Sequence, residues 1–190
     1  MVRNEKLHYH FDNYQKLSKD ELKVNTCYKV IADHVRAVTF AIADGVYPGN
    51  KDRGYIIRRL IRRSTVYGRK LGIAGAFLFS LVEDVLTSMK EFYPYIVEKY
   101  DAVVAAVKSE EEKFLKTLNK GSEFLENIMN SERVVSAKNA LLLFESYGFP
   151  IELTMEMAAE NEIEVDIKGF NKLFEEAKEV SRKARKDDKA

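Results

Sequence analysis

Residues 50–71 read NKDRGYIIRRLIRRSTVYGRKL and form the most informative segment of the chain. Successive residues of a helix lie about 100° apart, so this spacing gathers six cations within an arc of about 140°. These cations are Arg58, Arg59, Arg62, Arg63, Arg69 and Lys70. Four apolar residues fall on the opposite side, namely Ile56, Ile57, Leu60 and Ile61. We therefore predict a helix from about Asp52 to Leu71, ending before Gly72, with one basic and one apolar face.

Apolar residues recur at three- and four-residue spacing along most of the chain, which predicts further helices. Their approximate ranges are 25–44, 74–92, 95–130, 137–147, 152–161 and 167–186. Gly121 is a weak point in the longest of them. Nowhere do Thr, Val and Ile alternate with polar residues over the length of a strand, so we expect no sheet. The predicted fold class is all-α, a helical bundle of about six to seven helices including one long helix.

The composition is that of a globular protein, with 46% hydrophobic and 32% charged residues in a chain of 190. The 31 Lys and Arg nearly balance the 30 Asp and Glu, which argues against a wholly basic, histone-like protein. No apolar run approaches the ~20 residues of a membrane span, and the N-terminus lacks the apolar core of a signal peptide. A single cysteine, Cys27, excludes an internal disulfide. We expect a reducing, cytoplasmic setting and no membrane partner.

Residues that could carry catalysis or bind a metal are few. There is no Gly-rich phosphate loop of the P-loop or dinucleotide type. His8 and His10 are two residues apart, which suits neither helical metal ligation nor a zinc site with one available cysteine. His34 is expected to be a structural histidine at a helix packing surface, and Cys27 a small packed residue. The sequence therefore predicts no catalytic residue, no metal site and no cofactor in this chain.

The basic face of residues 52–71 needs an opposite charge, because like charges three and four residues apart repel each other. A phosphate backbone would supply that charge through bidentate hydrogen bonds from arginine. Acidic residues of the same chain could also supply it, for example Glu110, Glu111 and Glu112, and so could an acidic protein partner. A membrane surface fits less well, since the opposite face is needed for the core.

Two other stretches are unusual. Residues 46–55 form a polar turn that leads into the basic helix, and residues 144–150 end a helix with Gly148 in a C-terminal capping position. Taken alone, Asn50 is most simply a turn residue or a helix cap. Glu145 taken alone is an exposed carboxylate near a helix end.

Read together, these stretches resemble the tRNA-recognition region of alanyl-tRNA synthetases. Residues 30–37 (VIADHVRA) resemble the helix that opens this region, and residues 44–63 resemble the next signature. Two more signatures follow in family order, Glu110 to Gly121 and Tyr147-Gly148-Phe149-Pro150 with Leu153-Thr154. The matches have family-like spacing and cover about residues 28–182.

The resemblance also implies how the chain is organised. Residues 1–25 would be a remnant of, or a linker from, an upstream catalytic domain. Residues 26–182 would be the helical tRNA-recognition domain, and residues 183–190 a charged tail. The catalytic and editing domains of the same parent chain would be its partners. The parent enzyme would use ATP with Mg and carry an editing-domain zinc, whereas this region alone would be inactive.

In this family the full enzyme is a class II synthetase that activates alanine with ATP and transfers it to tRNA. The resemblance implies that this region docks on the acceptor stem of tRNA(Ala) and recognises a G·U wobble pair. Such recognition is chemically reasonable, because RNA helices expose a wide, shallow minor groove. The guanine amino group is the distinguishing donor there, and an amide or carboxylate oxygen is its natural acceptor.

The family uses an Asn and an Asp for this pair, which correspond to Asn50 and Glu145. The glutamate is a departure, since its side chain is one methylene longer. We expect recognition to be retained, because losing a buried acceptor opposite an amino donor costs ~1–3 kcal/mol. The arginines would then position the RNA backbone. The predicted RNA-binding residues are Asn50, Glu145, Lys51, Arg53, Arg58, Arg59, Arg62, Arg63, Arg69 and Lys70.

Two other functions remain as alternatives. An independent helical module could use its basic helix to bind an acidic protein, but it would have no reason to carry Asn50 and Glu145 within ordered signatures. A helical DNA-binding protein would need a short recognition helix in a major groove. The basic helix here also supplies core residues, so this alternative ranks last.

Overall fold

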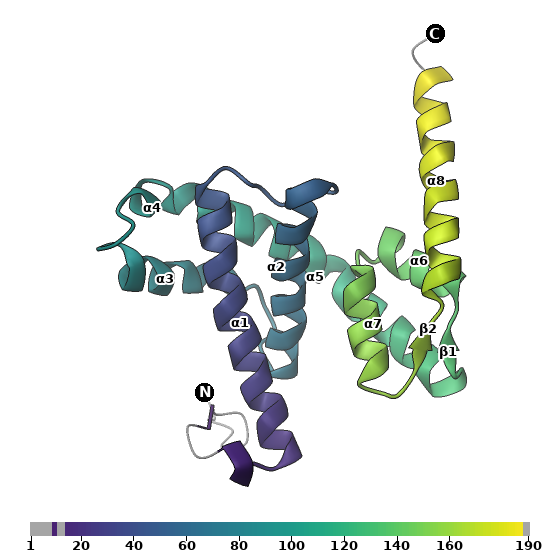
Figure 1. Ribbon diagram of the computed structural model, residues 1–190, viewed down its shortest axis with the longest axis horizontal. Coiled ribbons are helices and arrows are strands. Elements are labelled where there is room, and N and C mark those ends of the chain that lie inside the picture. The colour runs from purple at the N-terminus through teal and green to yellow at the C-terminus, as the bar shows by residue number, and fades with distance from the viewer. Residues whose placement is uncertain (1–8, 11–13, 188–190) are drawn as a thin grey trace. The chain divides into compact units, whose positions relative to one another are not determined.

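The computed structural model describes residues 9–10 and 14–187 of the chain (Figure 1). This part contains eight α-helices, two short 3-10 helices and one pair of two-residue strands. The all-α fold class is therefore confirmed, including one long helix. The chain divides into two compact units, residues 1–115 and 116–190, which are described separately below.

Helix α1 (Lys19–Ala43) begins before the predicted residue 25. A capping box starts it, because the Ser18 hydroxyl accepts from the Glu21 amide and the Glu21 carboxylate accepts from the Ser18 amide. The next turn is stabilised by polar contacts, since the buried Asn25 side chain exchanges two hydrogen bonds with the backbone of His10. These polar partners explain why apolar periodicity did not reveal the start. The short 3-10 helix η2 (Tyr14–Lys16) precedes α1.

Helix α2 (Asp52–Lys70) confirms the predicted basic helix and packs along α1 (Figure 1). Ile57 and Ile61 are buried, whereas Ile56 is 45% exposed, so the apolar face is narrower than predicted. These two isoleucines join an apolar core built from α1 and from residues between 78 and 107. Its members include Ile31, Val35, Val38 and Ile42 of α1 together with Leu78, Val82, Ile96, Val103 and Val107.

Residues 74–92 do not form the single helix that we predicted. A 3-10 helix, η3 (Leu78–Leu81), leads into the shorter α3 (Val82–Met89). The backbone N–H groups of Phe77 and Leu78 donate hydrogen bonds to the carboxylate of Glu111, at 2.9 and 3.1 Å. The start of this segment is thus set by a residue more than thirty positions away, which no local pattern reveals.

The predicted helix 95–130 is divided into α4 (Tyr95–Glu98) and α5 (Tyr100–Ser131). Helix α5 contributes residues to both units. It continues through Gly121, which we predicted to be a weak point. A Cβ at this glycine would lie 2.4 Å from the ring of Phe149, so glycine there allows the ring to pack against the helix.

Unit 2 contains α6 (Ala137–Ser146), α7 (Ile151–Ala159) and α8 (Ile167–Asp187), close to their predicted bounds. Strands β1 (Val134–Val135) and β2 (Glu164–Val165) pair in parallel, so the expectation of no sheet was wrong. Two-residue strands are too short to show an alternating pattern. Helix α8 also runs through part of the predicted tail, and the predicted domain limits at residues 26 and 182 stay a prediction.

Candidate nucleic-acid interface

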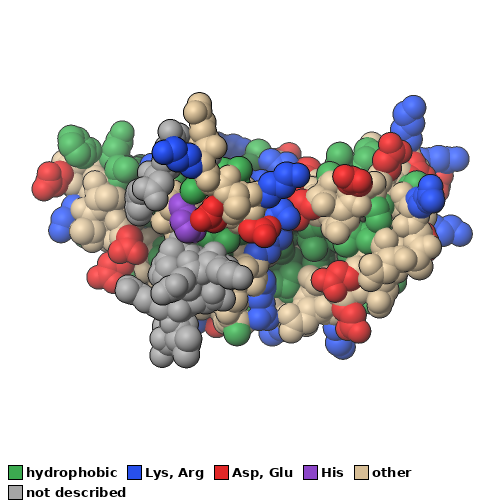
Figure 2. All heavy atoms as spheres, turned by 90° about the horizontal axis from the view of Figure 1, so that it is seen from below, with side chains coloured by type: hydrophobic (Ala, Val, Ile, Leu, Met, Phe, Trp, Pro, Cys, Tyr) green, Lys and Arg blue, Asp and Glu red, His purple; other side chains and the backbone are tan. Residues whose placement is uncertain are grey.

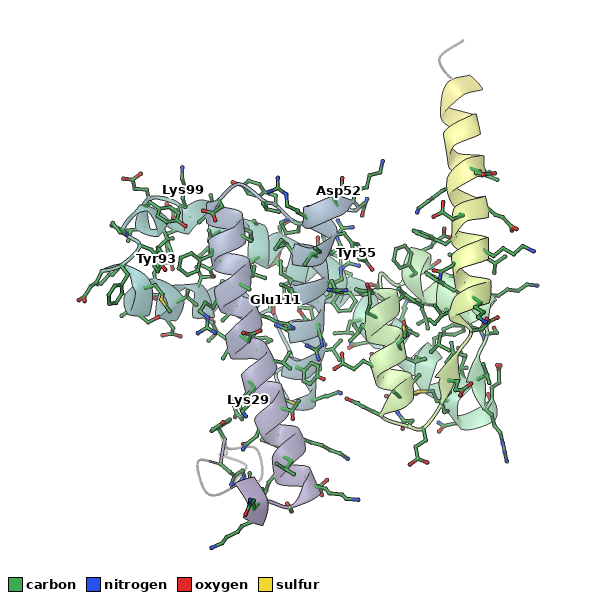
Figure 3. The ribbon with its side chains drawn as sticks, viewed as in Figure 1. Lys29, Asp52, Tyr55, Tyr93, Lys99 and Glu111 are labelled. Atoms are coloured by element: carbon green, nitrogen blue, oxygen red, sulfur yellow. The ribbon has the colours of Figure 1, made fainter. Side chains whose placement is uncertain are left out.

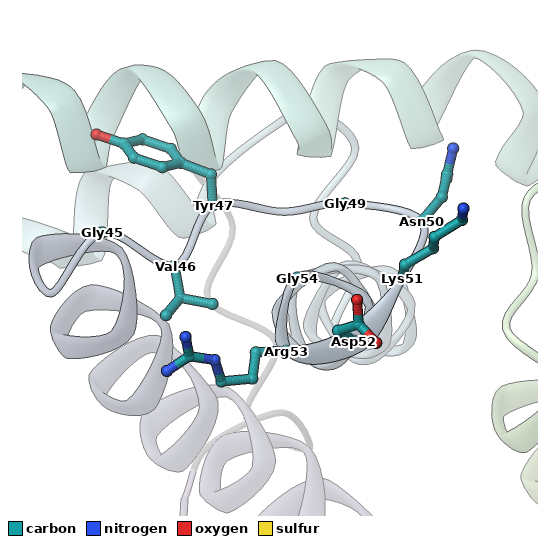
Figure 4. A pocket seen from close by; sticks show the side chains of 9 residues that line it. All are labelled: Gly45, Val46, Tyr47, Gly49, Asn50, Lys51, Asp52, Arg53 and Gly54. Atoms are coloured by element: carbon teal, nitrogen blue, oxygen red, sulfur yellow. The ribbon is translucent and has the colours of Figure 1, made fainter.

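The loop between α1 and α2 is held directly against the first turn of α2 (Figure 4). The amide of Gly49 donates to the carbonyl oxygen of Gly54, at 2.9 Å. A Cβ at Gly54 would lie 2.7 Å from the carbonyl oxygen of Tyr47, so only glycine permits this approach. The glycine therefore determines where the loop, and Asn50 within it, lies.

Asn50, Lys51 and Arg53 are all exposed on this loop and the helix start. They line an open depression of about 490 Å³ formed by residues 45–47 and 49–54 (Figure 4). Lys51, not Asn50, occupies the N-cap position of α2, and no side chain caps the helix there. Asp52 follows with φ +50°, a left-handed conformation that Asp tolerates better than most residues. Asn50 is thus a turn residue and not a helix cap.

Asn50 contacts the basic helix through its oxygen. The Nη1 atom of Arg58 donates a hydrogen bond to Oδ1 of Asn50. Arg58 in turn approaches α5, where its Nε lies 3.2 Å from Oε1 of Glu110. Arg62 donates to the same carboxylate oxygen through Nε and Nη2, at 2.8 and 2.5 Å. Asn50, Arg58, Glu110 and Arg62 therefore form one polar network.

Glu110 is the buried centre of this network, with a side chain that is 4% exposed. The guanidinium of Arg62 also lies over the ring of Phe114, 5.1 Å from its centre. Burial lowers the pKa of Arg62, although Glu110 beside it favours the charged form. The interpretation that acidic residues of the chain neutralise the basic face is thus realised at Arg58 and Arg62.

The three consecutive glutamates of α5 have three different roles. Glu111 is fully buried in unit 1 (Figure 3) and accepts hydrogen bonds from the backbone at the start of η3. Burial raises the pKa of Glu111, while the backbone N–H donors oppose that shift. Glu112 is exposed, with Oε1 4.0 Å from Nζ of Lys108 on the same helix. Only Glu110 faces the cations of α2.

Farther along α2, two cations pack over a buried aromatic ring. Arg63 and Lys70 lie over Tyr67, 5.2 and 4.6 Å from its centre. Nη1 of Arg63 is 2.9 Å from Nε2 of His34, which is 8% exposed. Since a guanidinium only donates, Nε2 accepts, and the predicted structural role of His34 is confirmed.

The predicted cations therefore differ in exposure. Figure 2 shows basic side chains gathered over α2 with carboxylates beside them. The exposed ones are Lys51, Arg53 and Lys70, and the half-buried ones are Arg58, Arg59, Arg62, Arg63 and Arg69. The basic face is thus not a uniform cationic surface.

Glu145 lies in unit 2, in the last turn of α6, and is exposed. The turn after it is firmly held. Gly148 has φ +72°, as its predicted capping position requires, and the Phe149 amide donates to the Leu143 carbonyl oxygen at 2.9 Å. The hydroxyl of Thr117 donates to the Tyr147 carbonyl oxygen at 2.7 Å. Asn50 and Glu145 thus stand in different units, each on a turn fixed by its own contacts.

A family model for tRNA synthetases class II (A) matches residues 2–190 of the chain. The chain belongs to this family. It is similar to the alanine–tRNA ligases of Mycoplasma capricolum subsp. capricolum (59% identical over 189 residues) and Mesoplasma florum (57% over 182). That of Bacillus velezensis is 42% identical over 174 residues. These matches cover 100%, 96% and 89% of this chain but only 21%, 20% and 20% of the relatives. The chain thus spans about a fifth of their length.

The resemblance that the ordered signatures indicated is therefore confirmed. Which residues of this synthetase region contact RNA stays a prediction. Sequence reasoning did not assign a role to Gly54, and it named Glu110 only together with Glu111 and Glu112 as a possible counter-charge. Glu110 and Arg62 are 48 positions apart, and nothing in their spacing distinguishes Glu110 from its two acidic neighbours. Gly54 could have been noticed as a glycine in the first turn of a helix, where it weakens helix formation unless something packs against it.

Among residues 9–10 and 14–187, no three His, Cys, Asp or Glu side chains come together in a way that could hold a metal ion. Within the same residues, no helix combines the length and apolar character needed to cross a membrane. Cys27 is buried, in agreement with the packing role predicted for it. His8 lies outside the described residues.

Proposed function

We propose that this chain is the tRNA-binding region of an alanine–tRNA ligase and that it binds the acceptor stem of tRNA(Ala). Membership of the class II synthetases and the names of the similar relatives support this proposal. The full-length protein would use ATP with Mg to attach alanine to tRNA in the cytoplasm. The ATP site, the editing zinc and the catalytic and editing domains would belong to the part of the protein beyond this chain. This region alone would make no alanyl-adenylate.

The observation that carries the proposal is the loop before α2. It presents Asn50, an amide able to contact a base edge, next to Lys51 and Arg53, two exposed cations able to contact phosphates. The depression beside them is open, which suits the shallow minor groove of an RNA helix. Glu145 would supply a carboxylate acceptor for the guanine amino group of a G·U pair.

The cations of α2 would contribute unequally to phosphate binding. Lys51, Arg53 and Lys70 are exposed and would contact phosphates most strongly. Arg59, Arg63 and Arg69 are half-buried and would contribute less. Arg58 and Arg62 face Glu110 and would act mainly by supporting the loop. An acidic protein partner is less well supported, because part of the face it would need is already neutralised within the chain.

The test is binding of the full-length protein that contains this chain to two acceptor-stem hairpins, with G·U or G·C at the same position. We expect a preference of about tenfold for G·U, lost in Asn50→Ala and in Glu145→Ala. Both affinities should fall as salt rises from low to moderate, because phosphate contacts release counterions. Asn161→Ala and Glu132→Ala change exposed residues of the same types away from these turns and should keep the preference.

The outcomes separate the parts of the proposal. Equal, salt-sensitive binding to both hairpins would leave phosphate binding and overturn recognition of the pair. No binding at low salt would overturn RNA binding altogether.

A further inference from the structure

We propose that Glu110 is a positioning residue for Asn50, acting through Arg58, and that Asn50 therefore presents its amide nitrogen to the RNA base. This inference rests on the RNA-binding function proposed above. It adds a residue from α5 to the site and specifies the chemical group that the loop offers.

The first step is the burial of Glu110. A carboxylate that is 4% exposed needs charged hydrogen-bond partners, because desolvation otherwise disfavours the ion. Arg62 supplies two donors to Oε1, and Arg58 a third nitrogen at 3.2 Å. Without the carboxylate, the two guanidinium groups would repel each other one helical turn apart. Glu110 therefore orients Arg62 through hydrogen bonds and attracts Arg58 through its charge.

The second step is the geometry of Arg58. Its guanidinium is planar and rigid, and Glu110 attracts it through an ion pair in which Nε makes no hydrogen bond, so this attraction also directs Nη1. That nitrogen donates to Oδ1 of Asn50. The side chain of Arg58 is only 23% exposed, so it sits between the carboxylate and the loop instead of extending into solvent. Glu110 thus influences the orientation of the Asn50 amide through Arg58.

The amide of Asn50 meets Arg58 through a defined atom. Arg58 has donors only, so the atom of Asn50 that meets it must be the oxygen, whichever way the amide is assigned. Figure 4 shows the side chain of Asn50 extending from the loop with its nitrogen at the outer end. The group offered is then a donor, and its match on a minor-groove edge is an acceptor such as a pyrimidine O2 or a purine N3. The guanine amino group would then donate its hydrogen bond to a carboxylate, which Glu145 can provide.

The decisive experiment compares the Asn50→Ala penalty on two hairpins, one with G·U and one with inosine·U, which lacks the amino group. The full-length protein is used, and its binding constants are measured. A donor at Asn50 predicts a loss of about tenfold on both hairpins. A loss on G·U alone would mean that the oxygen reads the amino group, which overturns this inference but keeps the proposed function. No loss on either hairpin would remove Asn50 from recognition and would count against the proposed function itself.

The role of Glu110 is tested by a double-mutant cycle. Glu110→Gln keeps the size and removes the charge, and should reduce the G·U preference about fivefold in the native protein but not in Asn50→Ala. Arg58→Lys, at a less buried position, should give the same pattern because an ammonium lacks the planar fork. Glu112→Gln is the matched control and should change nothing. Three results would overturn the positioning role. The two variants could weaken binding of the G·U and G·C hairpins equally, they could reduce the G·U preference as much in the Asn50→Ala protein as in the native one, or neither could reduce it at all.

Discussion

Asn50 lies on the loop before α2 and Glu145 lies just before the turn after α6, but different forces hold the loop and the turn. Asn50 stands on a loop fixed by a backbone contact at Gly54 and by the charged network of Glu110 and Arg58. Glu145 precedes a turn fixed mainly by aromatic packing, with Phe149 fully buried against Gly121.

This difference has a physical consequence for each turn. Charged networks respond to the loss of a charge or a donor, whereas packed rings respond to a change in volume. In unit 2, Tyr147 also stacks on Phe124 with ring centres 5.7 Å apart, so the turn has apolar contacts on both sides of Gly148. The loop before α2 should therefore be sensitive to charge and the turn after α6 to size.

The largest expected effect is the loss of stability caused by a steric clash at Gly121. In Gly121→Val, the new Cβ would lie 2.4 Å from the Phe149 ring and 2.9 Å from Cβ of Tyr147, so the turn must move. We expect unit 2 to lose about 3 kcal/mol of unfolding free energy, the upper range for overpacking a core. Chemical denaturation followed by circular dichroism measures it. Gly75→Ala adds a Cβ with no atom within 4 Å, and stability should stay nearly unchanged.

A substitution of glycine in the loop before α2 should reduce the free energy of unfolding less than Gly121→Val does. In Gly54→Ala, the new Cβ would meet the Tyr47 carbonyl oxygen at 2.7 Å, which costs about 1–3 kcal/mol. Alanine recovers about 1 kcal/mol through its higher helix propensity. We expect a net loss of roughly 1 kcal/mol, together with displacement of the loop and loss of the G·U preference. Unchanged preference in a stably folded variant would show that the loop contact does not position Asn50.

The buried carboxylate of Glu111 should give a pH dependence. Its pKa is raised above the ordinary 4.5, so the folded state favours the protonated form. The stability that this group contributes is therefore fully present below about pH 4.5 and is lost as pH rises through the raised pKa. Unfolding free energies of native protein and Glu111→Gln, compared between pH 4.5 and 7, should show the native protein losing stability relative to the variant. The same comparison with Glu112→Gln should show no such trend.

The smallest effect concerns the exposed cations beside Asn50. Lys51→Ala and Arg53→Ala should weaken binding of the G·U and G·C hairpins equally. Each should lower the slope of log affinity against log salt by roughly 0.7–0.9, the value for one lost phosphate contact. Binding titrations at several salt concentrations measure this slope. A change in the ratio of the two affinities would instead mean that these cations take part in recognition of the pair.

Much of the fold could be predicted from local sequence patterns. The all-α class, the extent of α2 and the positions of α6 to α8 all follow from apolar residues at three- and four-residue spacing. The predictions were wrong at two starts that apolar periodicity does not show. The start of α1 uses a capping box, which is a local signature of polar residues, together with the buried Asn25, whereas the start of η3 uses Glu111 from α5, a distant partner.

The candidate site was only partly predictable. Asn50 and Glu145 came from the resemblance, and the cations of α2 from their shared face. Sequence alone did not show that Arg58 and Arg62 turn inward, because that depends on a carboxylate 48 positions from Arg62. It also did not show which of three adjacent glutamates would meet them, since that choice depends on the rotation of α5 against α2.

By itself, the sequence determined the helical class, the family and the residue types available for binding RNA. These depend on local periodicity and on ordered motifs, both of which can be read along the chain. Only the tertiary structure decided which cations are exposed and which atom of Asn50 is engaged. Burial and hydrogen-bond direction are properties of packed neighbours, and those neighbours come from helices that are distant in sequence.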